Sequence, residues 1–292
     1  MTNICAATVI LYNPEDDVFE NIISYAKDVA KIIVVDNSTK HNKELITKLE
    51  NALSNLLYIN NNANLGIATA LNIGCYKAIE LGYEWILTMD QDSRFINFPH
   101  YLSCLEKLKE DDSIAILAAN TNYNETMEIP KTPQCNTNEV LSAITSANFV
   151  NLKKFTEVGG FDNKLFIDLV DYDFSLKMNE AGYKIYELPF IYVKHSLGEI
   201  FHRKNLITRK VRAKIEHNPQ RVYYFTRNYL YVAAKHRQHF PKQLGLLKTL
   251  NMLFIHQVTK IILYEDKKFQ KIKAKFLGLI HYLSQKFGKY DL

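Results

Sequence analysis

The chain has 292 residues, of which 47% are hydrophobic and 23% charged, so it can bury a core of ordinary globular size. The formal net charge of +5 is unevenly divided, because residues 1–200 carry 16 Lys and Arg against 27 Asp and Glu, whereas residues 201–292 carry 20 against 4. The basic C-terminal part predicts contact with an anionic surface, and no stretch reaches the roughly 18–20 uninterrupted apolar residues that would argue for a membrane span.

Short β-branched runs alternate with helical patterns in the first ninety residues. We expect strands at 6–12, 31–35, 56–59 and 84–89, and helices at 18–30, 44–53 and 67–81. Strands that alternate with helices in this way indicate an α/β fold with a mostly parallel sheet. Such sheets bind ligands at the carboxyl ends of their strands, where Asn13, Asp36, Asn64, Asp90 and Asp92 fall.

The rest of the chain has a less regular pattern. We expect a helix at 100–110, a strand at 114–119, a polar loop at 120–138 and a helix at 174–181. From residue 203 onward the sequence is basic and reads as helical. We therefore place a domain boundary at residue 230, between a catalytic domain (1–230) and a helical, basic C-terminal region (231–292).

Cysteine spacing and the N-terminal pattern both favour a cytoplasmic protein. Cys5, Cys75, Cys104 and Cys135 show no CxxC or metal-ligand spacing, so we expect them to be reduced and mostly buried. The apolar run at 4–12 has no basic segment before it and ends in an Asn-Pro turn, which is typical of a strand rather than a signal peptide.

Asp90-Gln91-Asp92 directly follows the predicted strand at 84–89. Two carboxylates one residue apart can face one cleft where the chain turns. Such oxygen ligands suit Mg²⁺ or Mn²⁺, which takes one or two protein carboxylates together with phosphate oxygens and water. A surface turn capped by two aspartates is the alternative.

Other polar residues lie where a nucleotide could bind. Asp36 can accept hydrogen bonds from a nucleobase or ribose, or it can form an Asx turn. Asn64 and Gly66 open the helix at 67–81, where backbone N–H groups can face a phosphate, or they form a plain turn. Walker and complete GxGxxG motifs are missing from the sequence, which disfavours P-loop and dinucleotide sites.

Three carboxylates, Asp168, Asp171 and Asp173, precede the predicted helix at 174–181. Helix capping can use some of them, but three exceed that need, and one can act as the base for a sugar hydroxyl. His195 is either structural or part of a metal site. Arg227 either contacts a diphosphate or packs within an amphipathic helix.

Taken in order, these segments resemble the family 2 glycosyltransferases of the GT-A fold, and more closely the bacterial rhamnosyltransferases that use dTDP-L-rhamnose. The resemblance covers nearly the whole chain to about residue 230, and its collinear order is what makes it specific. The matching segments are VILYNP (9–14), VVDNS (34–38), NLGIA (64–68), ALNIG (70–74), LTMDQDS (87–93), GGFD (159–162), LFIDLVD (165–171), HSLG (195–198) and YYFTRN (223–228).

The resemblance implies a Rossmann-like sheet flanked by helices and a donor site at its edge. Asp36 would contact the thymine or uracil base, and Asp90 and Asp92 would hold Mg²⁺ or Mn²⁺ on the diphosphate, with His195 as a third candidate ligand. The residues it assigns to nucleotide-sugar binding are Tyr12, Asn13, Asp36, Asn64, Gly66, Asn72, Asp90, Gln91 and Arg227.

The resemblance also implies an inverting reaction. Asp171 matches the aspartate that serves as general base in the family's Glu-Asp motif, and Asp168 is a second candidate. Val170 stands where many relatives have glutamate. A single in-line displacement needs a base and a metal, and we find no motif that would supply an enzyme nucleophile.

Residues 241–287 are expected to form two helices. The second alternates lysines with Phe269, Ile272, Phe276 and Ile280, a pattern that suits a helix lying in a membrane interface near anionic lipid. A solvated helix packed on the core is the alternative. The family implies a lipid-linked saccharide acceptor at the inner face of the bacterial cell membrane, in surface polysaccharide synthesis.

Two other functions compete with rhamnosyl transfer. A family 2 enzyme could instead use a UDP-hexose or UDP-galactofuranose. The basic C-terminal part could bind nucleic acid, but its basic residues alternate with bulky aliphatic ones and the rest of the chain is acidic, so no nucleic-acid partner is expected.

Overall fold

The structure is a computed structural model that describes residues 5–121, 130, 132, 134–195, 200–204 and 211–292. The chain divides into two compact units. The sheet unit comprises residues 1–163 and 170–196, and the helical unit comprises residues 164–169 and 197–292. The boundary predicted at residue 230 therefore falls within the helical unit, inside a helix.

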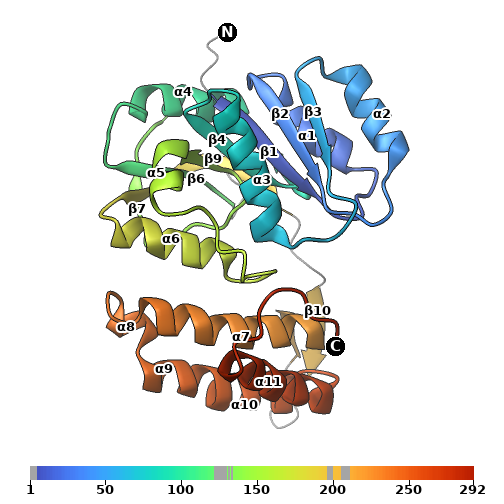
Figure 1. The fold of residues 1–292 in the computed structure, drawn as a ribbon, viewed down its shortest axis with the longest axis vertical. Helices are drawn as coiled ribbons and strands as arrows, with labels where there is room; N and C mark the ends of the chain where they lie inside the picture. Colours follow the sequence, from blue (N-terminus) through green and yellow to red (C-terminus); the bar gives the residue numbers. More distant parts are fainter. Residues whose placement is uncertain (1–4, 122–129, 131, 133, 196–199, 205–210) are drawn as a thin grey trace. The chain divides into compact units, whose positions relative to one another are not determined.

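The sheet unit contains a mixed sheet in the order β3-β2-β1-β4-β8-β6-β9-β5 (Figure 1). The strands are β1 (Cys5–Leu11), β2 (Lys31–Asp36), β3 (Leu56–Asn60), β4 (Trp85–Asp90), β5 (Ser93–Phe95), β6 (Ile114–Asn120), β8 (Asn148–Asn151) and β9 (Lys184–His195), and the short β7 (Asn138–Glu139) pairs with β9. The first four strands of this order are parallel, whereas β8 runs antiparallel to both of its neighbours. The predicted α/β class with a mostly parallel sheet is confirmed.

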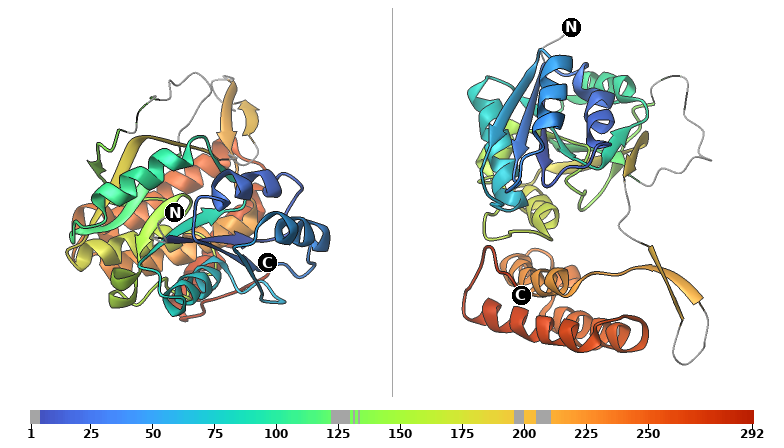
Figure 2. Two further views of the ribbon diagram at one scale, coloured as in Figure 1. Left: turned by 90° about the horizontal axis from the view of Figure 1, so that it is seen from above. Right: turned by 90° about the vertical axis from the view of Figure 1, so that its right-hand side faces the viewer.

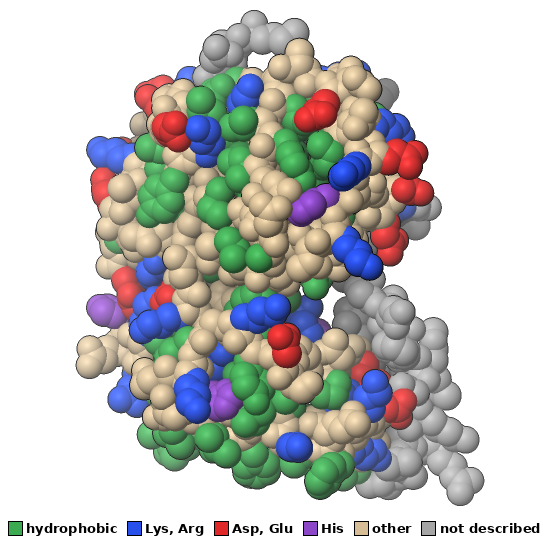
Figure 3. All heavy atoms as spheres, turned by 45° about the vertical axis from the view of Figure 1, so that its right-hand side comes forward, with side chains coloured by type: hydrophobic (Ala, Val, Ile, Leu, Met, Phe, Trp, Pro, Cys, Tyr) green, Lys and Arg blue, Asp and Glu red, His purple; other side chains and the backbone are tan. Residues whose placement is uncertain are grey.

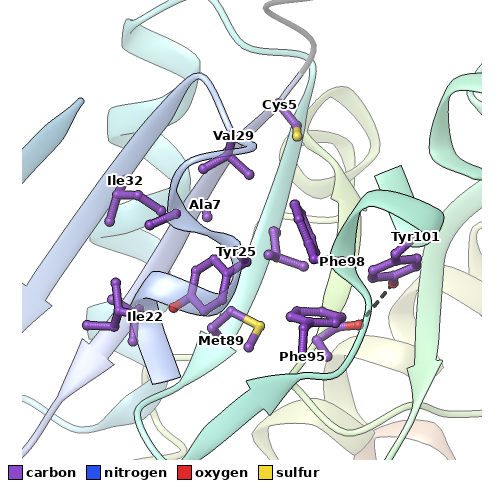
Figure 4. Packing of buried hydrophobic residues seen from close by; sticks show 14 of the residues in the cluster. Cys5, Ala7, Ile22, Tyr25, Val29, Ile32, Met89, Phe95, Phe98 and Tyr101 are labelled. Carbon is purple, nitrogen blue, oxygen red and sulfur yellow. Dashed lines mark hydrogen bonds between the residues drawn. The ribbon is translucent and has the colours of Figure 1, made fainter. Parts of the chain in front are cut away.

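Helices cover the sheet, and they are α1 (Val18–Ala26), α2 (Lys43–Ala52), α3 (Ile67–Glu80), α4 (Phe98–Leu108), α5 (Leu152–Glu157) and α6 (Val170–Glu180). The strand β1 is buried along its whole length because it has helices on both faces. Alternate residues of β1 join α1, α2 and α4 in the main core, which includes Tyr25, Phe95, Phe98 and Tyr101 (Figure 4). On the other face α3 approaches closely, since a Cβ at Gly74 would lie 2.1 Å from the Thr8 Oγ1 atom.

The helical unit begins with an antiparallel hairpin of β10 (Ile200–Lys204) and β11 (Val211–Ile215). It continues with α7 (Pro219–His236), α8 (Pro241–Leu244), α9 (Leu246–Leu250), the π-helix η1 (Asn251–His256), α10 (Gln257–Tyr264) and α11 (Lys268–Leu283) (Figure 2). The helical prediction from residue 203 is thus wrong for the hairpin. The two predicted tail helices are confirmed, with α8 to α10 as the first and α11 as the second.

One helical run is long and apolar enough to cross a membrane by length and composition alone. Within the part of the chain that the structure describes, this run is Pro241–Tyr264, and 17% of its most apolar 18-residue window is buried.

The prediction that all four cysteines are reduced is wrong for two of them. Cys104 in α4 and Cys135 in the loop before β7 form a disulfide, while Cys5 and Cys75 are free and buried. The pair is 31 residues apart, and nothing in the local pattern of that loop indicates that it returns to α4.

Candidate functional site

The carboxyl ends of four parallel strands lie at one edge of the sheet unit. Asn60 of β3 pairs with Asp36 of β2, Asp36 pairs with Leu11 of β1, and Ile10 pairs with Asp90 of β4. The segments that follow these strands therefore start side by side. This is the edge where sheets of this kind bind ligands, and it brings together most of the residues predicted for donor binding.

Gln91 joins the end of β4 to the end of β1. The Tyr12 N–H donates to Gln91 Oε1 at 2.8 Å, and Gln91 Nε2 donates to the Tyr12 carbonyl at 3.2 Å. The backbone of Gln91 is held in turn by Asn21, whose Nδ2 donates to the Gln91 carbonyl at 3.0 Å. Because both polar atoms of the Gln91 side chain bond to the Tyr12 backbone, we assign Gln91 to positioning Tyr12. Its contact with the nucleotide sugar stays a prediction. The Tyr12 side chain is 49% exposed.

Asp90 and Asp92 are half-buried at this edge. The Asp90 N–H donates to Ser146 Oγ at 3.3 Å, and the Ser146 and Ser93 hydroxyls lie 2.7 Å apart. The backbone of Ser93 pairs with that of His195. His195, the third predicted metal ligand, therefore lies across from the residue that follows Asp92. The side chain of His195 lies outside the described residues.

The donor set at this turn fits Mg²⁺ or Mn²⁺. Across the described residues, His, Cys, Asp and Glu form no metal-competent cluster of three or more. Two half-buried carboxylates are nevertheless what these ions commonly take from a protein when phosphate oxygens and water complete the shell. The turn therefore suits a metal that arrives with a diphosphate.

Asp36 is fully buried and accepts hydrogen bonds on both carboxylate oxygens. Oδ1 accepts from the Ser38 N–H at 2.8 Å, and Oδ2 accepts from the Tyr58 hydroxyl at 2.7 Å and from His41 Nδ1 at 3.0 Å. Asn60 Nδ2 lies 3.1 Å from His41 Nε2, and because an amide NH₂ only donates, this contact places the imidazole proton on Nδ1.

This network keeps Asp36 ionised. Desolvation alone would raise the pKa of the carboxyl, but the hydrogen bonds from Ser38, His41 and Tyr58 outweigh it and hold the pKa below its ordinary value. Sequence reasoning missed Tyr58 and His41. The sequence offered one indication, which is that Tyr58 places a phenolic hydroxyl in the predicted strand at 56–59.

Asp36→Asn is expected to lower the free energy of unfolding at neutral pH by about 1–3 kcal/mol, because it replaces a buried carboxylate acceptor. A lowered folded-state pKa adds stability above the unfolded-state pKa of about 4, and this stability is lost as the pH falls through the folded-state value. Urea unfolding between pH 7 and pH 3 should therefore show a flatter acid limb for the variant. Equal slopes in both proteins would contradict the assignment.

Asparagine side chains build the loops around this edge. Asn13 has a positive φ of 46°, and its N–H donates to Ser38 Oγ at 2.7 Å. Asn37 Nδ2 donates to the Gly66 carbonyl at 3.1 Å, while the Gly66 N–H donates to Asn64 Oδ1 at 3.0 Å. Asn64 thus forms the turn that was the alternative to phosphate binding. Gly66 caps α3 without a side chain, so the first-turn N–H groups have no side-chain cap.

Asn72 is buried and links α3 to the Gly-Gly turn. Its Nδ2 donates to the Phe161 carbonyl at 2.8 Å and to Asn163 Oδ1 at 2.9 Å, and its Oδ1 accepts from the Phe161 N–H at 2.9 Å. Gly160 has a φ of 64°, and a Cβ there would lie 2.8 Å from Asn72 Oδ1. We therefore assign Asn72 to the packing of this turn and leave it out of the nucleotide site.

Asp171 lies in the first turn of α6. This helix begins at Val170, four residues before the predicted start, so Asp171 and the buried Asp173 belong to the helix itself. Asp171 Oδ1 accepts from the Tyr172 N–H at 2.8 Å. The macrodipole favours an ionised carboxylate at this position.

A small cavity connects Asp171 with the end of β4. Its volume is about 10 Å³, and its lining includes Thr88, Thr145 and Asn148, which is room for about one water. Thr88 lies two residues before Asp90, and Thr145 precedes the serine that holds the Asp90 N–H. Asp171 therefore lies near the last residues of β4, in the same unit as the turn of Asp90 and Asp92.

Asp168, the second predicted base, belongs to the helical unit. Its carboxylate forms a two-pronged ion pair with Arg221, in which Arg221 Nε donates to Oδ2 at 3.1 Å. Asp168 and Leu169 both have positive φ values, 66° and 64°, and Asn228 Nδ2 donates to the Asp168 carbonyl at 3.1 Å. These contacts give Asp168 a structural role in shaping the segment before Asp171.

Arg227 lies in the interior of the helical unit with none of its side chain exposed. Its guanidinium donates to the Tyr223 hydroxyl at 3.2 Å and to the Gly288 carbonyl at 2.9 Å, and it lies 5.0 Å from the centre of the Tyr224 ring. These contacts correspond to the packed-helix alternative, so Arg227 is not included among the diphosphate ligands.

Comparisons with known proteins bear on the family and the fold of the chain. The sequence profile of "Glycosyl transferase family 2" matches residues 10–162. The chain is 29% identical over 289 residues to the "dTDP-rhamnosyl transferase RfbF" of Shigella flexneri, which covers 94% of this chain and 93% of that protein.

Solved structures share the fold. The mannosyltransferase PcManGT from Pyrobaculum calidifontis, solved with GDP-Man and Mn²⁺, has a TM-score of 0.59 at 14% identity and covers 97% of this chain and 87% of its own. S. aureus TarS 1–349 with UDP-GlcNAc has a TM-score of 0.58 at 17% identity, covering 93% and 79%. GalNAc-T7 with UDP, GalNAc and Mn²⁺ has a TM-score of 0.53 at 15% identity, covering 66% of this chain and only 43% of that longer protein.

Proposed function

The chain belongs to glycosyl transferase family 2, and on that premise we propose that it transfers L-rhamnose from dTDP-β-L-rhamnose to a hydroxyl of a saccharide acceptor, with inversion at the anomeric carbon. The observation that carries the choice of sugar is the likeness to a dTDP-rhamnosyl transferase along 94% of the chain. The fold neighbours, at 17% identity or less, support the architecture and not the donor.

The donor site of the proposal is the edge formed by the ends of β1, β2 and β4. Asp36 contributes to recognition of the base through Tyr58 and His41, which cover its carboxylate. Tyr12 and Asn13, which follow β1 at the same edge, complete the binding site for the base. Asp90 and Asp92 would hold Mg²⁺ or Mn²⁺, and a metal bound there would supply positive charge against that of the leaving diphosphate.

Asp171 is the general base of the proposal. Its carboxylate takes the proton of the acceptor hydroxyl while that oxygen forms a bond to the anomeric carbon. The bond from this carbon to the diphosphate oxygen breaks on the opposite face, and dTDP leaves with the electron pair. A single displacement of this kind inverts the anomeric centre without an enzyme nucleophile.

We further propose that the acceptor is lipid-linked and that the enzyme works in surface polysaccharide synthesis, as a peripheral protein at the cytoplasmic face of the cell membrane. Both statements extend the family membership and the basic composition of residues 201–292.

A donor screen tests the proposal. Isothermal calorimetry with dTDP-rhamnose, a UDP-hexose and UDP-galactofuranose, each with and without Mn²⁺, should show metal-dependent binding of dTDP-rhamnose at least about tenfold tighter than the others, since the lost polar contacts of a wrong donor cost a kcal/mol or more. Metal-dependent hydrolysis of the same donor gives a second readout. Preference for a UDP-sugar in both assays would overturn the assignment of rhamnose.

A further inference from the structure

The polarity of α11 is reversed compared with a helix on the surface of a soluble protein. Its apolar side chains Phe269, Phe276, Ile280 and Leu283 are 81%, 55%, 56% and 68% exposed. Their spacing of seven, four and three residues places them on one side of the helix. The residues of α11 that are buried are Lys271, Ala274, Lys275, Gly278 and His281.

Paired charges and close packing fix this orientation. Lys271 Nζ forms ion pairs with Glu216 and, at 2.9 Å, with Glu265. Lys275 Nζ donates to Gln257 Oε1 at 2.6 Å and to Thr226 Oγ1 at 3.2 Å. Turning α11 around would bury the apolar residues, but it would take Lys271 away from Glu216 and Glu265 and leave these carboxylates in the unit without that partner.

The packing against α7 reinforces the same orientation. A Cβ at Gly278 would lie 2.9 Å from the Tyr223 carbonyl oxygen of α7, so α11 and α7 approach more closely than larger side chains allow. The lysine side predicted to face the lipid headgroups is therefore partly internal, because Lys271 and Lys275 point into the unit.

The first tail helix adds to the apolar surface. Leu246, Leu247, Ile255 and Ile262 are 54%, 84%, 63% and 47% exposed. The Phe254 and Phe276 rings lie 6.4 Å apart, so this helix adjoins α11. Hydrophobic side chains gather along the lower edge of the helical unit in Figure 3. We give the name apolar outer face to eight of the exposed apolar residues of the two helices: Leu246, Leu247, Ile255, Ile262, Phe269, Phe276, Ile280 and Leu283.

Exposed lysines accompany the apolar outer face. Residues 241–292 contain ten Lys and no Arg, against three Asp and Glu. Lys248, Lys267 and Lys273 are exposed. Of the three acidic residues, Glu265 is buried, and Asp266 and Asp291 are exposed. On an ideal helix Lys273 lies about 60° from Phe276, so its ammonium group can reach outward beside the apolar residues.

We propose that the helical unit docks on an anionic lipid bilayer through the apolar outer face, with α10 and α11 lying in the interface. A bilayer is where a lipid-linked acceptor would be found. This biological reason for docking rests on the proposed function, whereas the docking surface itself is argued from the structure. A second copy of the chain would bring the same lysines together, so charge favours anionic lipid. Leu244, Leu253 and Ile261 of the first tail helix are buried in the unit, which favours a helix that stays with the unit over one that spans the bilayer.

Sedimentation with vesicles tests the docking. The full chain should bind vesicles of phosphatidylglycerol and phosphatidylcholine in equal parts, and bind pure phosphatidylcholine far more weakly. Phe269→Gln/Phe276→Gln should weaken binding about tenfold or more, because two large apolar side chains no longer enter the interface. Lys267→Gln/Lys273→Gln should weaken binding roughly thirtyfold on the anionic vesicles only.

The matched control is Leu81→Gln, which removes an apolar side chain of the sheet unit that is 44% exposed and should leave binding unchanged. Unchanged binding by the Phe double variant would overturn the proposal. So would lipid-free dimerisation that this variant abolishes, or membrane association that only detergent and not alkaline carbonate reverses. Donor hydrolysis without lipid should be equal in all variants, so a failure of the rhamnose assignment is seen separately from a failure of docking.

Discussion

Asp171→Asn is expected to lower sugar transfer by about 10²- to 10⁴-fold while donor affinity stays at the parent value, because an amide cannot take the proton of the acceptor hydroxyl. The variant keeps the local structure, since its Oδ1 can still accept from the Tyr172 N–H. Calorimetry with dTDP-rhamnose and Mn²⁺ measures the donor affinity, and chromatographic detection of the glycosylated acceptor measures the transfer.

Asp168→Asn is the matched control for this prediction. It removes a carboxylate from the same seven-residue segment, but one that is ion-paired with Arg221. It should retain transfer and lower the free energy of unfolding by about 1 kcal/mol, since the Arg221 side chain is 44% exposed and the pair is screened by solvent. Equal losses of transfer in both variants, or parental transfer by Asp171→Asn, would contradict the assignment of the base.

The sequence predicted the sheet edge well because local signals determine it. Parallel strands buried on both faces leave continuous apolar runs, and each run ends where polar residues begin. Asp36 and Asp90 therefore identify the ends of β2 and β4 without knowledge of their neighbours. The register of the strands then brings these residues together.

Contacts between distant residues could not be predicted in this way. Arg221 lies 53 residues from Asp168, and Cys104 lies 31 residues from Cys135. Neither separation corresponds to the repeat of a helix or a strand. Hydrophobic periodicity therefore cannot predict the ion pair or the disulfide. Asn72 illustrates the same limit, because its partners lie 89 and 91 residues further along the chain.

In the helical unit, composition predicted an amphipathic helix but not which of its sides faces outward. The alternation of lysines and large apolar residues in α11 predicts an amphipathic helix. Lysines are rarely buried unless they are paired, so the pattern alone favours a lysine side that faces solvent. Whether partners are present to bury the lysines cannot be read from the pattern. The partners of Lys271 are Glu216 and Glu265, and only the folded chain brings Glu216 to α11.

Asp92→Ala is expected to weaken donor binding in Mn²⁺ by about 100-fold or more, because the turn after β4 would keep only one of the two carboxylates that would hold the metal. Without metal, the variant and the parent should bind the donor equally. Calorimetry in the two conditions gives both values. The paramagnetic resonance signal of free Mn²⁺ reports metal uptake independently of activity.

Gln91→Ala separates a ligand of the metal from a residue that holds the turn. It removes the two hydrogen bonds between Gln91 and the Tyr12 backbone and leaves both carboxylates in place. Donor affinity should therefore fall by a similar factor with and without Mn²⁺, about thirtyfold for two hydrogen bonds that each contribute roughly 1 kcal/mol at a half-exposed site. If Asp92→Ala showed this metal-independent pattern and Gln91→Ala the metal-dependent one, the two roles would have to be exchanged. The metal would then bind beside the hydrogen bonds between Gln91 and Tyr12, and not at the aspartates that flank Gln91.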